Sequence, residues 1–402
     1  MAGVRRQISF LSAVFAMLFC LACSIEELED PEALLDRVRG VVDQQELDSD
    51  LPLQYWSYRG RLTQRFLRTG SRAQGYGIPA QRLREGGGLI WADATIFLGW
   101  YIGVLATEHQ LILRGQLPTV AGLPAATVFE SFTALANTQS ELFFALAALD
   151  RLDQSGEAAF ATPTICAGSA LDAPGFFIRD DVPIDFRVAG TGTFYSDFSA
   201  PFLRTILPGV IEDYLLNPEV SFNKEMSQDQ VYHLLLGLAL STRYMRGVVF
   251  ENTDLGAYAD VLAERMVQKM SGDDWRLENP ACYKRVNRGD DARAFSYGVS
   301  RALSQITGGR VNIDRAAYAP LWFGLLPAFD ATLTAGPLLE DGSYSDNLHM
   351  FMTLAAIGNG WNESTTARLT LYAGINDWYA YPLLHRALHG ESIDWPFFEP
   401  IV

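Results

Sequence analysis

Two pairs of acidic and histidine residues stand near the beginnings of apolar segments of this chain. Asp229 and His233 are four residues apart, and Asp346 and His349 are three apart. If these segments are helical, each pair lies on one helix face, where a carboxylate can orient an imidazole for proton transfer. A chain with 47 acidic residues and five histidines offers the same spacing by chance, so buried histidines with ordinary partners are the alternative interpretation.

The best candidates for catalytic carboxyl groups are Asp229 and Asp93, with Asp346 expected nearby. Asp229 and Asp93 follow turn-like residues and open the most apolar segments of the chain. An apolar helix beside a carboxyl group raises its pKa by desolvation, as a proton donor requires. Cleavage of a glycosidic bond needs one carboxyl group as donor and a second as base or nucleophile. The alternative is that these residues only cap their helices.

Further polar and aromatic residues stand in or near the first turns of the same kind of segment. Their amide, carboxylate and imidazole groups could bind sugar hydroxyls, and their aromatic rings could stack on sugar rings, although aromatic residues in helices more often belong to the core. The candidate substrate-binding residues are Trp91, Glu141, Gln230, His233, Asn347, His349, Asp377, Trp378 and Tyr381.

Helical segments must position these residues, because helix caps and stops dominate the sequence and strand-like alternation is scarce. Six segments are apolar on all sides, which predicts burial on all sides: Ile90–Leu113, Gln139–Asp153, Gln228–Met245, Ala292–Ile306, Ser345–Gly358 and Asn376–His389. Six others have a more charged face: Tyr55–Arg68, Ala125–Ala136, Pro201–Leu216, Leu255–Ser271, Arg315–Thr332 and Glu363–Ala373. Thr138-x-x-Glu141 predicts a capping box that separates two of these helices.

This alternation of six buried and six more polar helices resembles the (α/α)6 toroid of several glycoside hydrolase and polysaccharide lyase families. The resemblance covers about residues 55–395, and Ser227-Gln228-Asp229-Gln230 resembles the S-x-D-Q helix start of bacterial toroid proteins. It implies an all-α fold with alternating outer and inner helices, in which the six inner helices begin at one mouth of the barrel. Architecture alone assigns no reaction. An irregular helical bundle or an α-solenoid is the alternative.

The N-terminus indicates export and membrane anchoring. Arg5 and Arg6 precede the uncharged run 8–22, which is too short to span a bilayer comfortably and is typical of a secretory signal. Leu21-Ala22-Cys23-Ser24 resembles the lipobox of bacterial lipoproteins, which implies lipidation of Cys23 and, since Ser24 is not Asp, an outer-membrane destination. Ordinary cleavage and an uncleaved anchor are the alternatives. We therefore expect a signal peptide (1–22), an acidic tether (23–50) and one domain (51–402).

Cysteine usage agrees with export. After removal of Cys20 and lipidation of Cys23, Cys166 and Cys282 remain, an even pair in an oxidising compartment. We expect a disulfide between them, and two separate buried thiols are the alternative. No cluster of Cys and His has zinc spacing, so we expect no metal and no cofactor.

The loops and the net charge limit the classes of function. A formal charge of −16 excludes a strongly basic nucleic-acid binder, and neither a P-loop nor a G-x-S-x-G elbow is present. The segment 175–186 has the composition of a lid, and Lys284, Arg285 and Arg288 could recognise a uronate unless they only balance nearby acids. The sequence favours an envelope lipoprotein that binds or cleaves glycans. A non-catalytic helical scaffold is the alternative, and its protein partners are not encoded in any motif.

Overall fold

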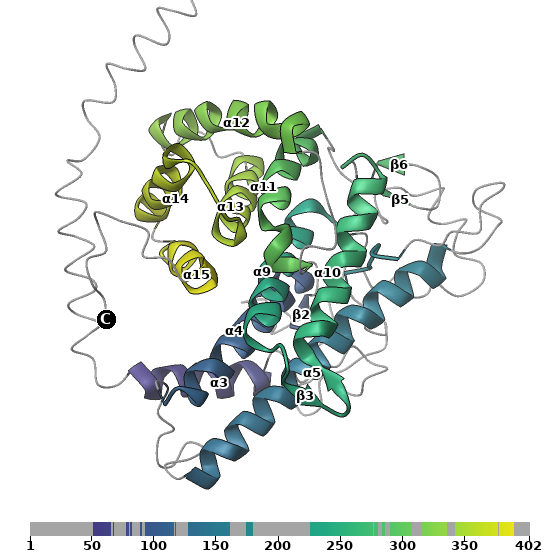
Figure 1. The fold of residues 1–402 in the computed structure, drawn as a ribbon, viewed down its shortest axis with the longest axis vertical. Helices are drawn as coiled ribbons and strands as arrows, with labels where there is room; N and C mark the ends of the chain where they lie inside the picture. Colours follow the sequence, from purple (N-terminus) through teal and green to yellow (C-terminus); the bar gives the residue numbers. More distant parts are fainter. Residues whose placement is uncertain are drawn as a thin grey trace, which may run out of the picture.

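The computed structural model shows an all-α protein (Figure 1). It describes residues 51–65, 67, 78–79, 81–82, 89–90, 93–115, 117, 128–160, 174–179, 226–275, 277–279, 284–285, 290–307, 315–335, 342–376 and 378–389. This part of the chain contains ten helices: α3 (Leu51–Arg65), α4 (Ala94–Leu113), α5 (Val128–Phe160), α9 (Gln228–Tyr244), α10 (Leu255–Gly272), α11 (Asp290–Ile306), α12 (Arg315–Ala335), α13 (Gly342–Ile357), α14 (Glu363–Asn376) and α15 (Ala380–His389).

Sheet structure in the same residues is confined to three antiparallel pairs of two-residue strands. These pairs are β1–β2 (Gln81–Arg82 with Leu89–Ile90), β3–β4 (Val249–Phe250 with Thr253–Asp254) and β5–β6 (Glu278–Asn279 with Lys284–Arg285). The prediction of a helical protein with little strand structure is therefore confirmed.

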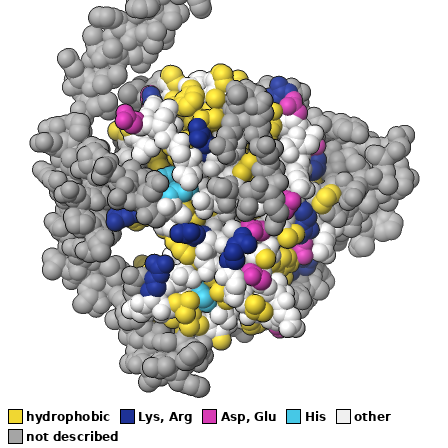
Figure 2. Space-filling model, in the orientation of Figure 1, with side chains coloured by type: hydrophobic (Ala, Val, Ile, Leu, Met, Phe, Trp, Pro, Cys, Tyr) yellow, Lys and Arg dark blue, Asp and Glu magenta, His cyan; other side chains and the backbone are white. Residues whose placement is uncertain are grey.

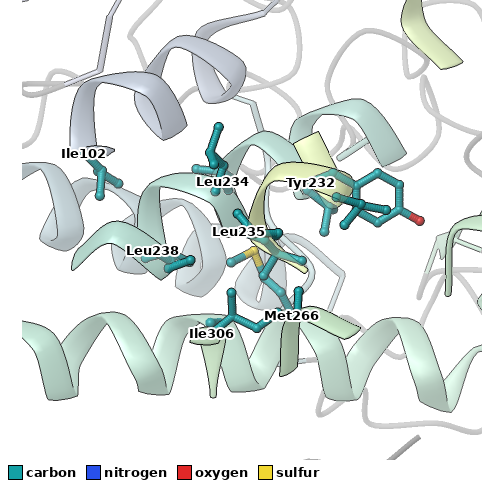
Figure 3. Packing of buried hydrophobic residues seen from close by; sticks show 14 of the residues in the cluster. Ile102, Tyr232, Leu234, Leu235, Leu238, Met266 and Ile306 are labelled. Atoms are coloured by element: carbon teal, nitrogen blue, oxygen red, sulfur yellow. The ribbon is translucent and has the colours of Figure 1, made fainter. Parts of the chain in front are cut away.

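One helix, α9, forms the centre of the core. Every residue from 231 to 240 is buried, as its uncharged sequence requires. Figure 3 shows Tyr232, Leu234, Leu235 and Leu238 of this helix packed with Ile102 of α4, Met266 of α10 and Ile306 of α11. Helices α13 and α15 also contact α9, so five of the other described helices pack against this one helix.

Helices α4 and α9 approach each other at glycine residues. A Cβ atom added to Gly99 would lie less than 3.0 Å from the backbone of His233, and one added to Gly237 would lie less than 3.0 Å from the backbone of Gly99. Any residue other than glycine at these two positions would force the two helices apart. The backbones of α4 and α9 are in direct contact as a result.

Helix α4 is also the described helix whose length and apolar composition would allow it to cross a membrane. However, 56% of its apolar window is buried inside the protein, as expected for a core helix. Its composition is therefore weak evidence for a membrane span.

Two expected helix boundaries were wrong. Residues 125–136 and 139–153 do not form separate helices, because α5 runs without a break through Thr138. The Thr138 hydroxyl lies 2.8 Å from the carbonyl oxygen of Ala134 and 2.5 Å from Glu108 Oε1, so it bonds within the helix and to α4 instead of capping a new helix. Likewise, Asn376 ends α14, and the last described helix begins only at Ala380.

The expected helix 201–216 and both cysteines of the expected disulfide lie outside the residues that the structure describes, as do the signal peptide and the tether. The other predicted helices are present, with their ends shifted by a few residues. Boundaries of helices commonly differ by this amount.

The contact between α4 and α9 predicts the effect of one small substitution. Gly237→Ala should lower the free energy of unfolding by about 1–3 kcal/mol, because its methyl group meets rigid backbone. Thermal and urea denaturation of the purified protein measure this change. Gly324→Ala in α12 is the matched control: its methyl group meets nothing within 4 Å, so removal of a helical glycine should leave stability unchanged or raise it by up to about 1 kcal/mol. Equal stability of the two variants would contradict the close contact.

Candidate functional site

A cavity of ≈390 Å³ opens between four helices. Its lining residues come from the first eight residues of α4, α9 and α13 and from the beginning of α15. They are Ile96, Trp100, Asp229, His233, Asp346, His349, Trp378, Ala380 and Tyr381. The amino ends of these helices therefore face one cavity, where their dipoles favour negative charge.

Asp229 and Asp346 line this cavity, and Asp93 is close enough to act on both carboxyl groups. Asp346 remains exposed, but its partial desolvation is the main cause of its raised pKa, and the charges of Asp229 and Asp93 raise this pKa further. Burial also raises the pKa of Asp93, with a further rise from Asp229, while Arg179 opposes it. The structure thus brings together the three candidate catalytic residues from α9, α13 and the residue before α4.

Asp229 and Asp93 are not needed as helix caps. At α9, Ser227 and Gln230 form a capping box in which the Ser227 N–H donates to Gln230 Oε1 at 3.3 Å. The Ser227 hydroxyl also donates a hydrogen bond to the Asp229 carboxylate. Asp93 precedes α4, but its side chain makes no capping hydrogen bond. Both carboxyl groups are therefore available for another role.

The two histidines have partners that differ from those expected. His233 Nδ1 lies 2.6 Å from the backbone oxygen of Asp229, so this nitrogen carries the proton and donates to the carbonyl. His349 Nδ1 lies 3.0 Å from the hydroxyl of Tyr381. Neither imidazole is oriented by the neighbouring carboxylate. The alternative interpretation, histidines with ordinary partners, therefore describes both residues better than carboxylate–imidazole pairs, because an imidazole on a helix reaches the carbonyl of the preceding turn, or a facing helix, more directly than that carboxylate.

Both imidazoles are uncharged near neutral pH. Burial lowers the pKa of His233. Burial and the positive charge of a protonated His233 lower the pKa of His349 to about 4. The ring of His349 also stacks on Trp378, with a centroid separation of 3.8 Å and an angle of 29°. The cavity therefore combines carboxyl groups with neutral imidazoles.

Trp100, which the sequence offered as a stacking platform for a sugar ring, lines the cavity, whereas Thr353 was not singled out by its position in the sequence. The Trp100 ring lies 5.6 Å from Tyr381 and 6.1 Å from His233, centroid to centroid. Thr353 is fully buried beneath the cavity, and its Oγ1 lies 3.4 Å from His233 Nε2 and 2.8 Å from the His349 carbonyl oxygen. One available signal was a hydroxyl residue four positions after His349 within an apolar helix.

Other candidate residues lie elsewhere. Gln230 is fully buried in the capping box, and Asn347 is half-buried without lining the cavity. Trp91 and Asp377 lie outside the described residues, as do Cys23, Cys166 and Cys282. Most of the expected lid and the side chains of the expected basic cluster lie outside them too.

Glu141 belongs to a separate buried network that joins α3, α4 and α5. Arg59 Nη2 lies 2.8 Å from Glu141 Oε2, and Arg59 Nε lies 2.8 Å from Glu108 Oε2. Tyr55 and Tyr101 donate hydrogen bonds to these two carboxylates. Loss of one partner would leave buried charge uncompensated, so this network is structural, and Glu141 does not line the cavity.

Metal binding has little support at the cavity. Within the described residues, no group of three or more His, Cys, Asp or Glu side chains is arranged to hold a metal ion.

Comparisons with protein-family models, with curated proteins and with solved structures found no match. Chemical interpretation of the site therefore depends on its geometry.

The buried environment of His349 predicts its titration. In NMR spectra its ring should titrate with a midpoint near pH 4 instead of the usual value of about 6.5, because burial disfavours the charged form. Trp378→Ala removes the stacked ring and admits water, so the midpoint should rise toward 6.5.

The same shift predicts part of the pH dependence of stability. Between about pH 6.5 and 4 the unfolded chain binds a proton at this histidine and the folded chain does not, so folding stability falls as the pH is lowered. His349→Gln should make this fall smaller. A His349 midpoint near 6.5 in the wild-type protein would contradict the buried environment.

Proposed function

We propose that this protein is an envelope lipoprotein whose (α/α)6 toroid domain binds glycans and cleaves a glycosidic bond. One observation carries the proposal: Asp93, Asp229 and Asp346 act on one another beside a cavity that is lined by Trp100, Trp378 and Tyr381. Two carboxyl groups and flat apolar surfaces beside one cavity are what glycoside cleavage requires.

The arrangement of helices supports the toroid. Cavity residues come from the beginnings of α4, α9, α13 and α15, so these four helices begin at the same end of the domain. Inner helices that all begin at one mouth are the feature that the resemblance implies. The more exposed helices α10, α12 and α14 alternate with the buried ones along the chain.

The three carboxyl groups can be assigned the roles of proton donor and of base or nucleophile. Asp93 and Asp346 have raised pKa values, so either can hold the proton that the departing glycosidic oxygen needs. Asp229 lines the cavity and accepts a hydrogen bond from the Ser227 hydroxyl, which orients its carboxylate. In this scheme Asp229 attacks the anomeric carbon or removes a proton from the attacking water, while Asp93 or Asp346 protonates the leaving oxygen.

The aromatic and imidazole side chains supply contacts for a sugar. Trp100 and Trp378 are half-buried, so each leaves part of its ring open to the cavity. Sugar rings present apolar C–H faces that can pack on such surfaces by the hydrophobic effect. A neutral His349 can exchange hydrogen bonds with sugar hydroxyls without attracting anions.

A scaffold is the second candidate, and the outer face of α12 favours it. Leu321 and Phe323 are 46% and 36% exposed, and Pro320 and Pro327 are also exposed. Figure 2 shows hydrophobic side chains gathered at the top of the view, over α12. Exposed apolar patches of this kind often mark protein or membrane contacts.

The carboxyl groups provide the test of the catalytic proposal. Asp229→Asn should change the free energy of unfolding by about 1 kcal/mol or less, because Ser227 and Gln230 still cap α9. It should lower glycan cleavage ~10²-fold or more, since the base is lost. Asp93→Asn and Asp346→Asn identify the donor by the same assay, which measures reducing ends released from envelope oligosaccharides.

Glu363→Gln is the matched control, because Glu363 is an exposed carboxylate in the first turn of α14, far along the chain from the cavity residues of α9. It should leave both stability and cleavage unchanged. Unfolding of Asp229→Asn, or full cleavage by it, would replace the catalytic role of Asp229 with a structural one.

The anchor is tested separately. Cys23 follows the uncharged run 8–22, so Cys23→Ser should abolish incorporation of a radioactive fatty acid and leave the protein soluble or with its signal retained. Equal labelling of wild type and variant would exclude lipidation at this residue.

A further inference from the structure

The cavity has one more carboxyl group than cleavage of a glycosidic bond requires. That reaction uses a proton donor and a base or nucleophile. Asp229 and Asp346 line the cavity, and Asp93 is close enough to act on both. Like charges repel, so a third carboxyl group at one place is costly unless a ligand compensates it. The third group is therefore available for substrate recognition, a role that rests on the glycan-binding function proposed above.

Asp346 is the carboxyl group that the reaction can spare. A proton donor benefits from burial, because desolvation keeps its carboxyl group protonated. Asp93 is half-buried, whereas Asp346 is exposed, so Asp93 suits the donor role better. Asp229 is held in place by a hydrogen bond from the Ser227 hydroxyl, as a base or nucleophile should be. Asp346 lines the cavity and remains accessible to a ligand.

The cavity wall carries negative charge without a balancing cation. Its lining residues include Asp229 and Asp346 but neither lysine nor arginine, and its two histidines are uncharged near neutral pH. Among the described side chains, Arg179 acts on Asp93, but no cation lowers the pKa of Asp346. Helix amino ends offset part of this charge, yet a full charge at contact distance outweighs the partial charge of a helix end.

Aromatic rings stand beside these carboxyl groups. Trp100 and Trp378 line the cavity and are half-buried, and Tyr381 lies 5.6 Å from Trp100, centroid to centroid. The face of a tryptophan ring attracts an ammonium group, and the attraction grows when the cation is removed from water. Carboxylates and aromatic rings around one cavity thus favour a cationic ligand that also has an apolar face.

We propose that the cavity recognises an amino sugar with a free, protonated amine, and that Asp346 pairs with its ammonium group while Trp100 and Trp378 pack against the sugar ring. An ammonium group donates hydrogen bonds to a carboxylate, and such charge-assisted bonds are stronger than those between neutral groups. The C–H faces of the same sugar cover the tryptophan rings by the hydrophobic effect.

Other classes of sugar fit this cavity less well. An N-acetylated amino sugar has no charge, so it gains nothing from Asp346. A uronate places its own carboxylate beside Asp229 and Asp346, where like charges repel. The uronate substrate suggested by Lys284, Arg285 and Arg288 is therefore not the one that the described cavity favours.

The test uses the full chain and three probes of equal length: oligomers of glucosamine, of N-acetylglucosamine and of galacturonic acid. In isothermal titration at about pH 6, glucosamine oligomers should bind at least about tenfold more tightly than N-acetylglucosamine oligomers, because only the former make the charge-assisted contact. Galacturonate oligomers should not bind. Added salt should weaken the binding of glucosamine oligomers more than that of the acetylated ones, since it screens the ion pair.

Asp346→Asn isolates the contact. It should weaken the binding of glucosamine oligomers about tenfold more than that of N-acetylglucosamine oligomers, and Asp346→Glu, which keeps the charge, should restore most of the difference. Because Asp346 is exposed, both variants should fold, and their melting temperatures check this. Glu363→Gln, an exposed carboxylate of α14, is the matched control and should bind all three probes like the wild type.

Three outcomes would overturn the proposal: equal affinity of the wild type for the glucosamine and N-acetylglucosamine oligomers, tight binding of galacturonate, or equal weakening of both amino-sugar probes by Asp346→Asn. The result is separable from the test of cleavage. A preference for the free amine without any cleavage would contradict the catalytic proposal and leave this recognition intact. Cleavage without that preference would contradict the recognition alone.

Discussion

The backbone contact between α4 and α9 is the constraint on which the candidate site depends. Gly99 and Gly237 leave no room for a Cβ atom, so the two helices lie closer than side chains would permit. Trp100 follows Gly99 directly, and the backbone of His233 is what a side chain at position 99 would strike. The same contact therefore sets the 6.1 Å separation of the Trp100 and His233 rings in the cavity wall. The packing of α4 against α9 and the geometry of the cavity wall therefore depend on the same glycine residues.

Opposite ends of the helices that line the cavity have opposite electrostatic character. Amino ends face the cavity, where Asp93, Asp229 and Asp346 gather and where Ser227 and Gln230 relieve Asp229 of the capping role. The carboxyl end of α13 meets His385 of α15 instead, where the carbonyl oxygen of Ala356 lies 3.0 Å from His385 Nδ1. Helix dipoles favour anions at the first end and cations at the second. One parallel arrangement of helix starts thus places carboxyl groups at one end of these helices and unpaired backbone carbonyl groups at the other.

The sequence patterns predicted which carboxyl groups lie at the cavity, but they did not predict the hydrogen-bond and ion-pair partners of other side chains. Asp229 and Asp346 were expected at one cavity because polar residues in first turns meet when helices begin at one end, and both line it. Glu141 has the same local pattern, yet Arg59 of α3 holds it in a buried network. Thr138 does not form the predicted capping box for a similar reason, because its hydroxyl bonds to Glu108 of α4 and to the carbonyl oxygen of Ala134. Such competition between near and distant partners is invisible in a single sequence.

The sequence by itself determined the helical class and most helix positions, because apolar periodicity and capping residues act within a few neighbouring residues. It also determined which residues could carry chemistry at helix starts. Tertiary structure alone decided that α5 is continuous, that His233 bonds a backbone carbonyl and that His349 bonds a tyrosine. These outcomes depend on which helices lie side by side and on how deeply each group is removed from water. Burial and distance are properties of the packed chain, so local spacing could not fix them.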